Sequence, residues 1–384
     1  MLKKILFVGM YPNKVDKYLN VFFQNLIYAM ADNGVECTVI SPVSITKYRT
    51  RIKNIPAECE EFTKNGAKVK VYFPRYISAS SKKIGNFNTR KISERNFQKC
   101  AMKTARKLKS EFDLVYGHFV LDGGLAAIKV GKALGLPSFF AYGECDFESQ
   151  VQSSYGLLKQ KDVDGLCGVV SVSSKNTNEL KSFHVFDNIP FITAPNAVNP
   201  KEFYPKERTK ARACFDIPQN AFVVGFVGGF IERKGDKRLL EAVNSIDGVY
   251  VAFAGKGAEP PSGEKVVFCR ALPHESVCDF LNAVDVFVLP TLSEGSCNAI
   301  AEAMSCGCPI ISSDLPFNDD VLNEENSIRI DPNSVEEIRD AIQKVYEDDG
   351  FRAHLREESL KTAEKLKIHN RAKRIEEFLY ANIK

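Results

Sequence analysis

The first half of the chain alternates between short apolar runs and longer segments whose apolar residues recur with a helical period. Strand-like runs lie at residues 3–9, 36–42, 67–73, 113–119, 137–143 and 165–174, and helical segments lie at 20–34, 89–110 and 123–135. The helices at 20–34 and 123–135 are predicted to end at Gly34 and Gly135, since glycine readily adopts the left-handed conformation that stops a helix. Short apolar strands separated by helices indicate parallel β-α-β construction.

A second series of the same kind begins near residue 198. Its strands are predicted at 222–229, 249–255, 264–269, 285–291 and 308–314, with helices at 236–246 and 274–284 among them. A chain of 384 residues is also long enough for two domains. We therefore expect an α/β protein with two Rossmann-like, doubly wound domains that face each other across a cleft.

The proline-bearing segment 186–205 is the predicted hinge between these domains. The expected boundaries are 1–190 for the N-terminal domain and 191–368 for the C-terminal domain. The last segment, 369–384, is expected to be a helix that returns toward the N-terminal domain.

The amino-acid composition indicates to which broad class of protein the chain belongs. Apolar residues make up 44% and charged residues 26% of the chain, as in soluble globular proteins. No run approaches the roughly 20 apolar residues of a membrane span, so we expect a cytoplasmic protein, with peripheral attachment to the inner face of the membrane left open. The eleven cysteines include no C-x-x-C pair and the five histidines are scattered, so we expect neither a metal site nor a cofactor.

Charge is distributed unevenly. Residues 1–195 hold 28 Lys and Arg against 17 Asp and Glu, a net of +11, whereas the remainder has a net of −7. The segment from Lys82 to Lys109 alone holds ten basic residues and one acid, Glu94. This pattern fits a solvated helix face, or a basic surface beside an anionic membrane or a lipid-phosphate substrate. We expect no nucleic-acid partner.

Two glutamates stand eight residues apart in the stretch SEGSCNAIAEAMSCGCP, residues 293–309. The pattern predicts strand, loop, helix and strand, with Ser296 or Asn298 as the helix cap. Glu294 would then lie in the loop at the carboxyl end of a strand, where ligands of open α/β sheets bind, and Glu302 one turn into the helix. The N–H groups at the helix start can hold an anion. The stretch therefore predicts a phosphate site with one carboxylate on either side for hydroxyl groups.

The same stretch, continued as SEGSCNAIAEAMSCGCPIISSD and preceded by DVFVLPT, resembles the E-x7-E motif region of the family 4 glycosyltransferases. Further resemblances to this family follow in order along the chain, in DLVYGHFVLDGGLAAIKVGKALGLP, PNAVNPKEFYP, FVGGFIERKG and VYVAFAGKG. The resemblance implies a retaining enzyme of the hexosyltransferase type with the two-domain GT-B fold. It would move a sugar from a UDP or GDP sugar to a glycan or lipid-linked acceptor in cell-surface polysaccharide or glycoconjugate synthesis.

The resemblance also implies roles for donor-site residues. Glu302 would bind the ribose hydroxyls, and Glu294 would bind hydroxyls of the transferred sugar. Lys234, with Arg233, would neutralise the leaving diphosphate in place of a metal. The remaining donor-site candidates act mostly through their backbone, near the sugar, the phosphate or the base: Leu272, His274, Gly295, Ser296, Cys297 and Asn298.

His118 would contact the donor sugar from the other domain, as a positioning group. The chain departs from the family pattern at Gly229, where an arginine is usual and for which Arg233 is the candidate substitute, and at Gly9, which stands alone where many relatives have a glycine-rich loop. The acceptor-side candidates are Gly9, Tyr142, Glu144 and Asp146.

Other activities fit the sequence less well. A nicotinamide enzyme would need G-x-G-x-x-G after its first strand, but Gly255 and Gly257 come late and Pro260 takes the third glycine position. The pair Asp162 and Asp164 matches the D-x-D of metal-dependent transferases without their context. A nucleotide-sugar epimerase on the same fold and a non-catalytic sugar-nucleotide-binding protein remain as alternatives. The sugar, the base and the acceptor stay open.

Overall fold

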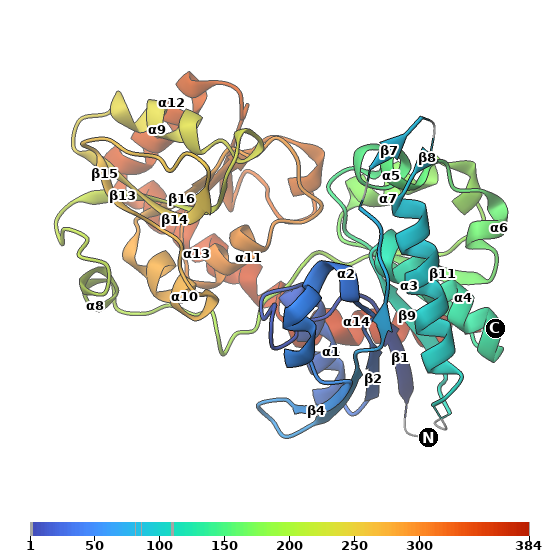
Figure 1. The fold of residues 1–384 in the computed structure, drawn as a ribbon. Coiled ribbons are helices and arrows are strands. Elements are labelled where there is room, and N and C mark those ends of the chain that lie inside the picture. The colour runs from blue at the N-terminus through green and yellow to red at the C-terminus, as the bar shows by residue number, and fades with distance from the viewer. Residues whose placement is uncertain (1–2, 81, 86, 109–110, 384) are drawn as a thin grey trace. The chain divides into compact units, whose positions relative to one another are not determined.

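The protein is described by a computed structural model that covers residues 3–80, 82–85, 87–108 and 111–383 (Figure 1). The chain forms two compact units, Met1–Ala194 with Ile368–Lys384, and Pro195–Lys367. The first boundary falls between residues 194 and 195 rather than between 190 and 191, because β12 (Phe191–Thr193) pairs with β11 (Leu166–Ser171) in the first unit. The second falls between 367 and 368.

The first unit contains an eight-stranded sheet in the order β12-β11-β10-β9-β1-β2-β5-β4. Its remaining strands are β1 (Lys4–Val8), β2 (Glu36–Ile40), β4 (Glu58–Phe62), β5 (Lys68–Tyr72), β9 (Leu114–His118) and β10 (Ser138–Tyr142). The predicted parallel strands are confirmed, but β4 runs antiparallel to β5 at the edge. The turn between them contains Gly66 at φ 86°. The sequence pattern missed β4 because its residues, ECEEF, are mostly charged.

Helices cover the faces of this sheet (Figure 1). They are α1 (Val21–Asp32), α3 (Arg90–Ala105), α4 (Leu125–Leu134) and α7 (Ser174–Lys181), with the short helices α2 (Ile45–Tyr48), α5 (Ser153–Tyr155) and α6 (Gln160–Val163). Two small ribbons pair β3 (Val43–Ser44) with β6 (Arg75–Tyr76), and β7 (Lys83–Ile84) with β8 (Phe87–Asn88). The basic helix predicted over 89–110 ends at Ala105, and Lys109 lies outside the described residues.

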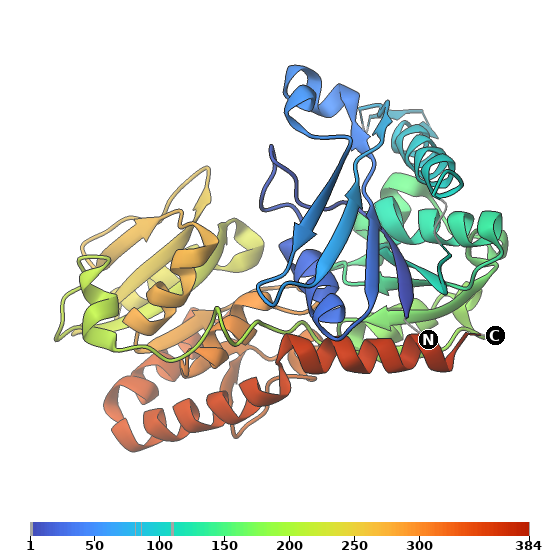
Figure 2. The ribbon, with the colours of Figure 1, turned by 90° about the horizontal axis from the view of Figure 1, so that it is seen from below.

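The C-terminal helix α14 (Ile368–Ala381) packs against the first unit, where Figure 2 shows it passing beside the strands. Lys3 Nζ lies 2.6 Å from Glu376 Oε1, at one end of the contact. Phe378 packs edge-on against Phe139, and a Cβ at Gly168 would come within 2.8 Å of the Phe378 ring. A glycine at residue 168 therefore lets the helix approach the sheet closely.

The second unit is built on a six-stranded parallel sheet in the order β15-β14-β13-β16-β17-β18. The strands are β13 (Phe222–Phe230), β14 (Val249–Gly257), β15 (Val266–Arg270), β16 (Val286–Leu289), β17 (Ile310–Ser313) and β18 (Ser327–Ile330). The helices are α8 (Arg208–Ala213), α9 (Asp236–Asn244), α10 (His274–Ala283), α11 (Asn298–Ser305), α12 (Val335–Glu347) and α13 (Asp349–Lys365). The chain runs from β13 outward to β15 and then returns to place β16 on the other side of β13. Such a reversal of strand order is where open α/β sheets bind ligands.

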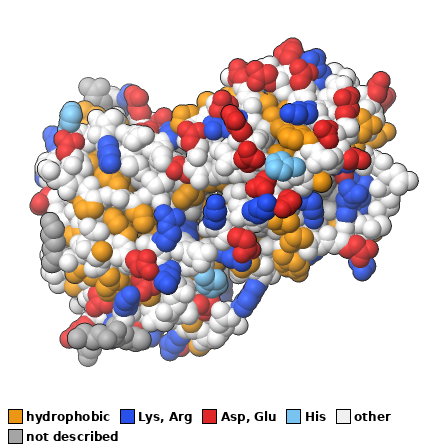
Figure 3. All heavy atoms as spheres, turned by 180° about the vertical axis from the view of Figure 1, so that it is seen from behind, with side chains coloured by type: hydrophobic (Ala, Val, Ile, Leu, Met, Phe, Trp, Pro, Cys, Tyr) orange, Lys and Arg blue, Asp and Glu red, His pale blue; other side chains and the backbone are white. Residues whose placement is uncertain are grey.

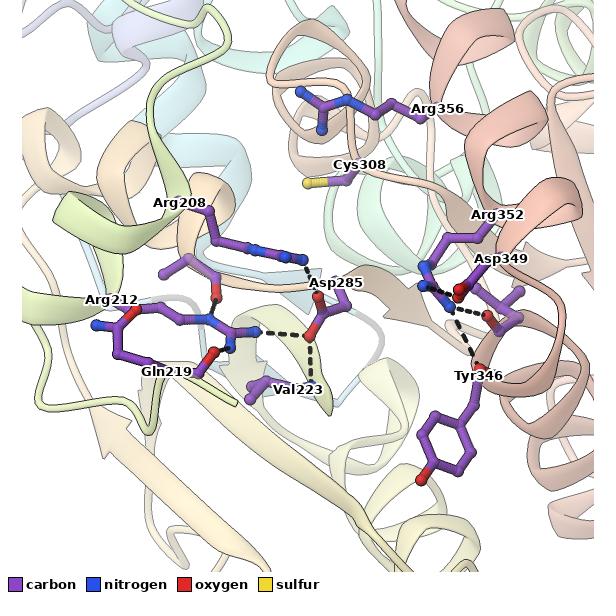
Figure 4. A network of polar contacts seen from close by, with 12 residues as sticks. Arg208, Arg212, Gln219, Val223, Asp285, Cys308, Tyr346, Asp349, Arg352 and Arg356 are labelled. Carbon is purple, nitrogen blue, oxygen red and sulfur yellow. Dashed lines mark hydrogen bonds and ion pairs between the residues drawn. The ribbon is translucent and has the colours of Figure 1, made fainter. Parts of the chain in front are cut away.

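A buried carboxylate, Asp285, anchors the amino end of β16 (Figure 4). Its Oδ2 accepts hydrogen bonds from Arg212 Nη2 at 2.6 Å and from the Val223 N–H at 2.7 Å, and its Oδ1 pairs with Arg208. Arg212 is also buried, and its Nε donates to the Ala283 carbonyl at 2.9 Å. The network ties α8 to both central strands, β13 and β16.

We predict that Asp285→Ala destabilises the protein by about 3–5 kcal/mol, because it leaves the buried Arg212 guanidinium without its counter-charge. The matched control is Asp349→Ala, which breaks an ion pair with Arg352 whose carboxylate side chain is 87% exposed. This control should barely change the urea concentration at which half of the protein is unfolded. Urea unfolding followed by circular dichroism measures both, and equal midpoints for the two variants would contradict the prediction.

Candidate functional site

The candidate site lies at the carboxyl ends of β13 and β16. Past its end, β13 enters a short 3-10 turn, η5 (Glu232–Lys234), and β16 is followed by a loop, residues 290–297, that leads into α11. The Leu292 N–H donates to the Arg233 carbonyl at 2.8 Å, which joins loop and turn. Gly235 has φ 78°, and a Cβ there would come within 2.5 Å of the Pro290 carbonyl oxygen. Only glycine allows the turn to lie this close to the loop.

Glu294 is the centre of this arrangement. The carboxylate is buried, and its Oε1 lies 2.5 Å from Lys234 Nζ and 2.9 Å from Arg233 Nη1. Thr291 donates its hydroxyl to the same oxygen at 2.9 Å. The structure thus brings together three residues that the sequence analysis predicts, Glu294, Lys234 and Arg233. Thr291 was missed because a threonine after a strand carries no distinctive sequence signal.

Two cations against one carboxylate leave this corner of the site positively charged. Burial lowers the pKa of Lys234, but its neighbours Cys297 and Glu294, the latter through charge and a hydrogen bond, outweigh burial, so the net shift is upward. Lys234 is therefore protonated at neutral pH. Arg233 supplies the second positive charge. The arrangement suits an anion with several oxygens, such as a diphosphate.

The start of α11 differs from the prediction. The N-cap residue is Cys297, which makes no side-chain capping bond, so the expectation that Ser296 or Asn298 caps the helix is wrong. Ser296 is engaged elsewhere, since its Oγ accepts the Asn196 N–H at 3.0 Å and its carbonyl accepts Asn196 Nδ2 at 3.1 Å. Asn298 is the first helical residue, and Gly295 lies in the preceding loop. Without a polar cap, the first N–H groups of α11 suit an anionic ligand.

Glu302 and His274 form a pair between two helices. Glu302 lies in α11 and its Oε1 is 3.5 Å from Nε2 of His274, the first residue of α10. Burial raises the pKa of Glu302, and the hydrogen bond that His274 donates to Glu302 raises the pKa of His274. The sequence analysis assigned His274 a role through its backbone and missed this pairing, because the two residues lie on different helices. The neighbouring Leu272 is half-buried against the core of the second unit.

The other predicted donor-site position, Gly229, faces open space. A Cβ built there would have only the Lys256 carbonyl oxygen within 4 Å, at 3.8 Å. Gly229 lies near the carboxyl end of β13, two residues before the chain leaves the strand. A longer side chain would therefore fit at this position.

His118 ends β9 in the first unit, and its side chain is buried among aromatic rings. It stacks on Phe23 with ring centroids 4.5 Å apart, and Gly9 packs beside both residues. Burial lowers the pKa of His118 to about 3, so the ring is neutral. Within the described residues neither ring nitrogen has a hydrogen-bond partner. Leaving a buried polar atom unpaired costs about 1–3 kcal/mol, which a ligand hydroxyl could recover.

The three other acceptor-side candidates have partners inside the first unit. Tyr142 donates its hydroxyl to Glu179 Oε2 at 2.6 Å. Glu144 is buried, which raises its pKa to about 7, and it accepts the Val120 N–H at 2.8 Å. Asp146 accepts a backbone N–H from the following turn, which lowers its pKa. These contacts stabilise the segment that follows β10.

The described part of the chain shows neither a metal-binding cluster nor a helix able to span a membrane. No group of three or more His, Cys, Asp or Glu side chains there is arranged to hold a metal ion. No helix there is both long and apolar enough to cross a membrane.

Residues 221–348, most of the second unit, match the family model described as Glycosyl transferases group 1. The putative teichuronic acid biosynthesis glycosyltransferase TuaC of Bacillus subtilis is 26% identical over 356 residues, which cover 89% of this chain and 88% of that protein. The lipopolysaccharide core biosynthesis glycosyltransferase LpsE of Rhizobium meliloti is 31% identical over 160 residues, 39% of this chain and 47% of that protein. Sucrose-phosphate synthase of Thermosynechococcus elongatus superposes with a TM-score of 0.75 at 19% identity, over 99% of both chains.

The chain therefore has the GT-B fold and is a glycosyltransferase. The predicted fold class is confirmed, and so is the predicted enzyme class. The relatives that carry this conclusion are named for the synthesis of cell-surface polysaccharides.

The pH dependence of stability tests the pair between α10 and α11. Because the pKa of His274 is raised in the folded state, the stability that this pair contributes is present below the ordinary histidine pKa of about 6.5. It is lost as the pH rises through the raised value. The difference in free energy of unfolding between wild type and Glu302→Gln should therefore shift in favour of the variant as the pH rises from 6 toward 9. Urea unfolding at several pH values measures this, and a difference that favours wild type more at high pH would contradict the pairing.

Proposed function

We propose that the chain is a retaining glycosyltransferase that takes a sugar from a UDP or GDP sugar and transfers it to a glycan or lipid-linked acceptor in the synthesis of cell-surface polysaccharide. The observation that carries the proposal is the buried Glu294 carboxylate held by Lys234 and Arg233 at the carboxyl ends of β13 and β16. Carboxylate and cations meet there within 3 Å, so one small site can bind both sugar hydroxyls and phosphate.

In this proposal the donor extends along the second unit. Its diphosphate would lie against Lys234, Arg233 and the N–H groups at the start of α11. Its ribose hydroxyls would bind Glu302, whose orientation is set by His274. Glu294 would accept hydrogen bonds from the transferred sugar once the phosphates draw Lys234 and Arg233 away from it. Each residue then serves a different part of the donor.

The chemistry proposed is front-face transfer. As the bond between the anomeric carbon and the diphosphate breaks, negative charge grows on the leaving oxygens, where Lys234 is protonated and stabilises it. The departing diphosphate takes the proton of the acceptor hydroxyl, and the acceptor oxygen bonds to the anomeric carbon on the same face. In this scheme Lys234 and Arg233 supply the positive charge that a divalent cation supplies in other transferases. His118, neutral and without a partner in the described residues, would bind a sugar hydroxyl.

We also propose that α3 brings the enzyme to an anionic membrane surface, where a lipid-linked acceptor would be found. Lys91, Arg95, Lys99 and Lys103 recur every four residues, so they share one face of α3, and all four are exposed. The opposite face is buried through residues such as Phe97. On the face of the molecule drawn in Figure 3, by contrast, basic and acidic side chains are interspersed. The stripe on α3 is the single-sign surface that an anionic bilayer attracts.

Binding of nucleotide sugars tests the donor site. A thermal-shift panel would compare UDP, GDP, ADP and dTDP sugars. Sugars that carry one of these bases should raise the melting temperature of the protein, because a ligand that binds the folded state stabilises it. Lys234→Ala should lower the affinity for the corresponding nucleotide diphosphate by roughly 10- to 150-fold, which is the contribution of one hydrogen bond between charged groups. The control is Lys237→Ala, a neighbouring exposed lysine paired with Glu259, which should bind as wild type.

Glu294→Gln separates the binding of the transferred sugar from the binding of the diphosphate. It should leave binding of the bare nucleotide diphosphate intact, because both cations are freed, and remove the additional affinity that the attached sugar provides. Equal weakening of both ligands, or equal effects of the Lys234 and Lys237 variants, would contradict the donor-site assignment. A product whose anomeric configuration is inverted by proton NMR would contradict retention.

Vesicle sedimentation tests the membrane proposal. Vesicles with 30% phosphatidylserine should bind the protein at low salt and release it at high salt, because screening weakens exposed charges. Lys99→Glu/Lys103→Glu should reduce binding at least roughly tenfold, at about 1 kcal/mol per basic residue near the surface. The control, Lys210→Glu/Lys237→Glu, makes the same change of charge on the second unit. Binding that is independent of salt, or equal loss in both variants, would contradict a specific role of α3.

A further inference from the structure

Helices α10 and α11 meet in two cross-helix pairs, one turn apart. The first pair is His274 with Glu302, at 3.5 Å. Four residues further along each segment stand Cys278 and Cys306, with their Sγ atoms 3.9 Å apart. Cys306 is the C-cap of α11, and its N–H still donates to the Glu302 carbonyl at 3.1 Å, so the helical register holds. Residues four apart in a helix lie on the same face, so the thiol pair lies directly below the carboxylate–imidazole pair.

The thiols of Cys278 and Cys306 contact each other, whereas the nearby Cys308 contacts the backbone. Cys308 donates its thiol to the Leu281 carbonyl at 3.0 Å, a contact that holds it in place. Cys278 and Cys306 contact each other, and both side chains are buried. All eleven cysteines are free thiols. The closeness of Cys278 and Cys306 is therefore a property of the reduced protein.

A groove of about 380 Å³ lies beside this region. Its wall includes Tyr204 and Ser305. The Cys278 thiol donates to the Tyr204 carbonyl at 3.6 Å, and Ser305 directly precedes Cys306. Both cysteines thus adjoin residues that line the groove, although neither is exposed at the surface.

We propose that Cys278 and Cys306 are a reversible oxidation site, where a disulfide formed by a small peroxide shifts the His274–Glu302 pair and weakens nucleotide binding. The Cys278 sulfur attacks one oxygen of hydrogen peroxide, which breaks the O–O bond, forms a sulfenic acid and releases water. The Cys306 sulfur then attacks the sulfenic sulfur and releases a second water. Two thiols lose two electrons and two protons, and one peroxide becomes two waters. A dithiol reverses the step by exchange.

Cys278 is the better nucleophile of the two. The hydrogen bond from the Cys306 thiol lowers the pKa of Cys278 to about 7, against the effect of burial, and the Lys206 ammonium lowers it further. The same contact raises the pKa of Cys306. Reactivity with peroxide follows the thiolate form, so oxidation begins at Cys278.

The disulfide has to move the helices. Its sulfur atoms must approach from 3.9 Å to about 2.05 Å, the length of an S–S bond. Because the pair lies only one turn from His274 and Glu302, the movement reaches the contact between those residues. The consequence for nucleotide binding rests on the function proposed above, whereas the disulfide and its effect on His274 do not.

The test treats the full chain with hydrogen peroxide, blocks remaining thiols and maps disulfides by peptide mass spectrometry. We expect a link between residues 278 and 306 that dithiothreitol removes, and a nucleotide diphosphate affinity that falls roughly tenfold on oxidation, as for the loss of one good hydrogen bond. Cys278→Ser and Cys306→Ser should each keep their affinity under peroxide. Cys214→Ser, which replaces an exposed cysteine, should respond as wild type.

A second measurement keeps this test independent of the proposed function. Proton NMR titration of His274 should show its pKa falling toward the ordinary histidine value on oxidation, as the contact with Glu302 is lost. Absence of the 278–306 link overturns the proposal, and so does a link that leaves the pKa of His274 unchanged. A reduced protein that binds no nucleotide would contradict the donor site instead, while the link and the NMR result still decide the oxidation site.

Discussion

A buried carboxylate that stays ionised needs hydrogen bonds or positive partners, and the second unit places such a carboxylate at each end of β16. Asp285 directly precedes the strand and Glu294 follows it, and both are buried. Each is held by two basic side chains, Arg208 and Arg212 at the amino end and Arg233 and Lys234 at the carboxyl end. The position of β16 between β13 and β17 therefore fixes where two pairs of cations lie. The anchor of β16 and the candidate site thus lie at opposite ends of the same strand.

The two ends differ in how completely the carboxylate is enclosed. The side chain of Arg212 is 2% exposed, and its guanidinium also donates to backbone carbonyls. Replacing any partner in that network would therefore leave a buried polar group without a hydrogen bond. The side chain of Arg233 is 36% exposed and lies on a turn, with Lys234 beside it. Its contacts can pass from a carboxylate to a phosphate at little cost, because both are anionic oxygen acceptors. The enclosed end stabilises the fold, whereas the open end can bind a ligand.

Local periodicity predicted most of the strands and the two units, and the resemblance to a family pointed to the three central site residues. Both failed where the deciding contact is distant in sequence. Ser296 looked like a helix cap, but Asn196 takes its hydroxyl, and Cys297 occupies the cap position. His274 and Glu302 are joined only by the packing of α10 on α11. Local sequence preferences predict helices and strands. They do not show which polar side chains form hydrogen bonds with residues distant in the sequence.

The contact of Asn196 with Ser296 also connects the site to the place where the chain passes between units. Asn196 is the second residue of the second unit, and two hydrogen bonds join it to the loop that carries Glu294. Two residues on, the Val198 N–H donates to the Leu366 carbonyl at 2.9 Å, which pairs the entering segment with the one about to leave. Hydrogen bonds within the second unit thus join the entering segment both to the Glu294 loop and to the segment about to leave. These bonds hold the loop that carries Glu294 against the segment where the chain enters the second unit.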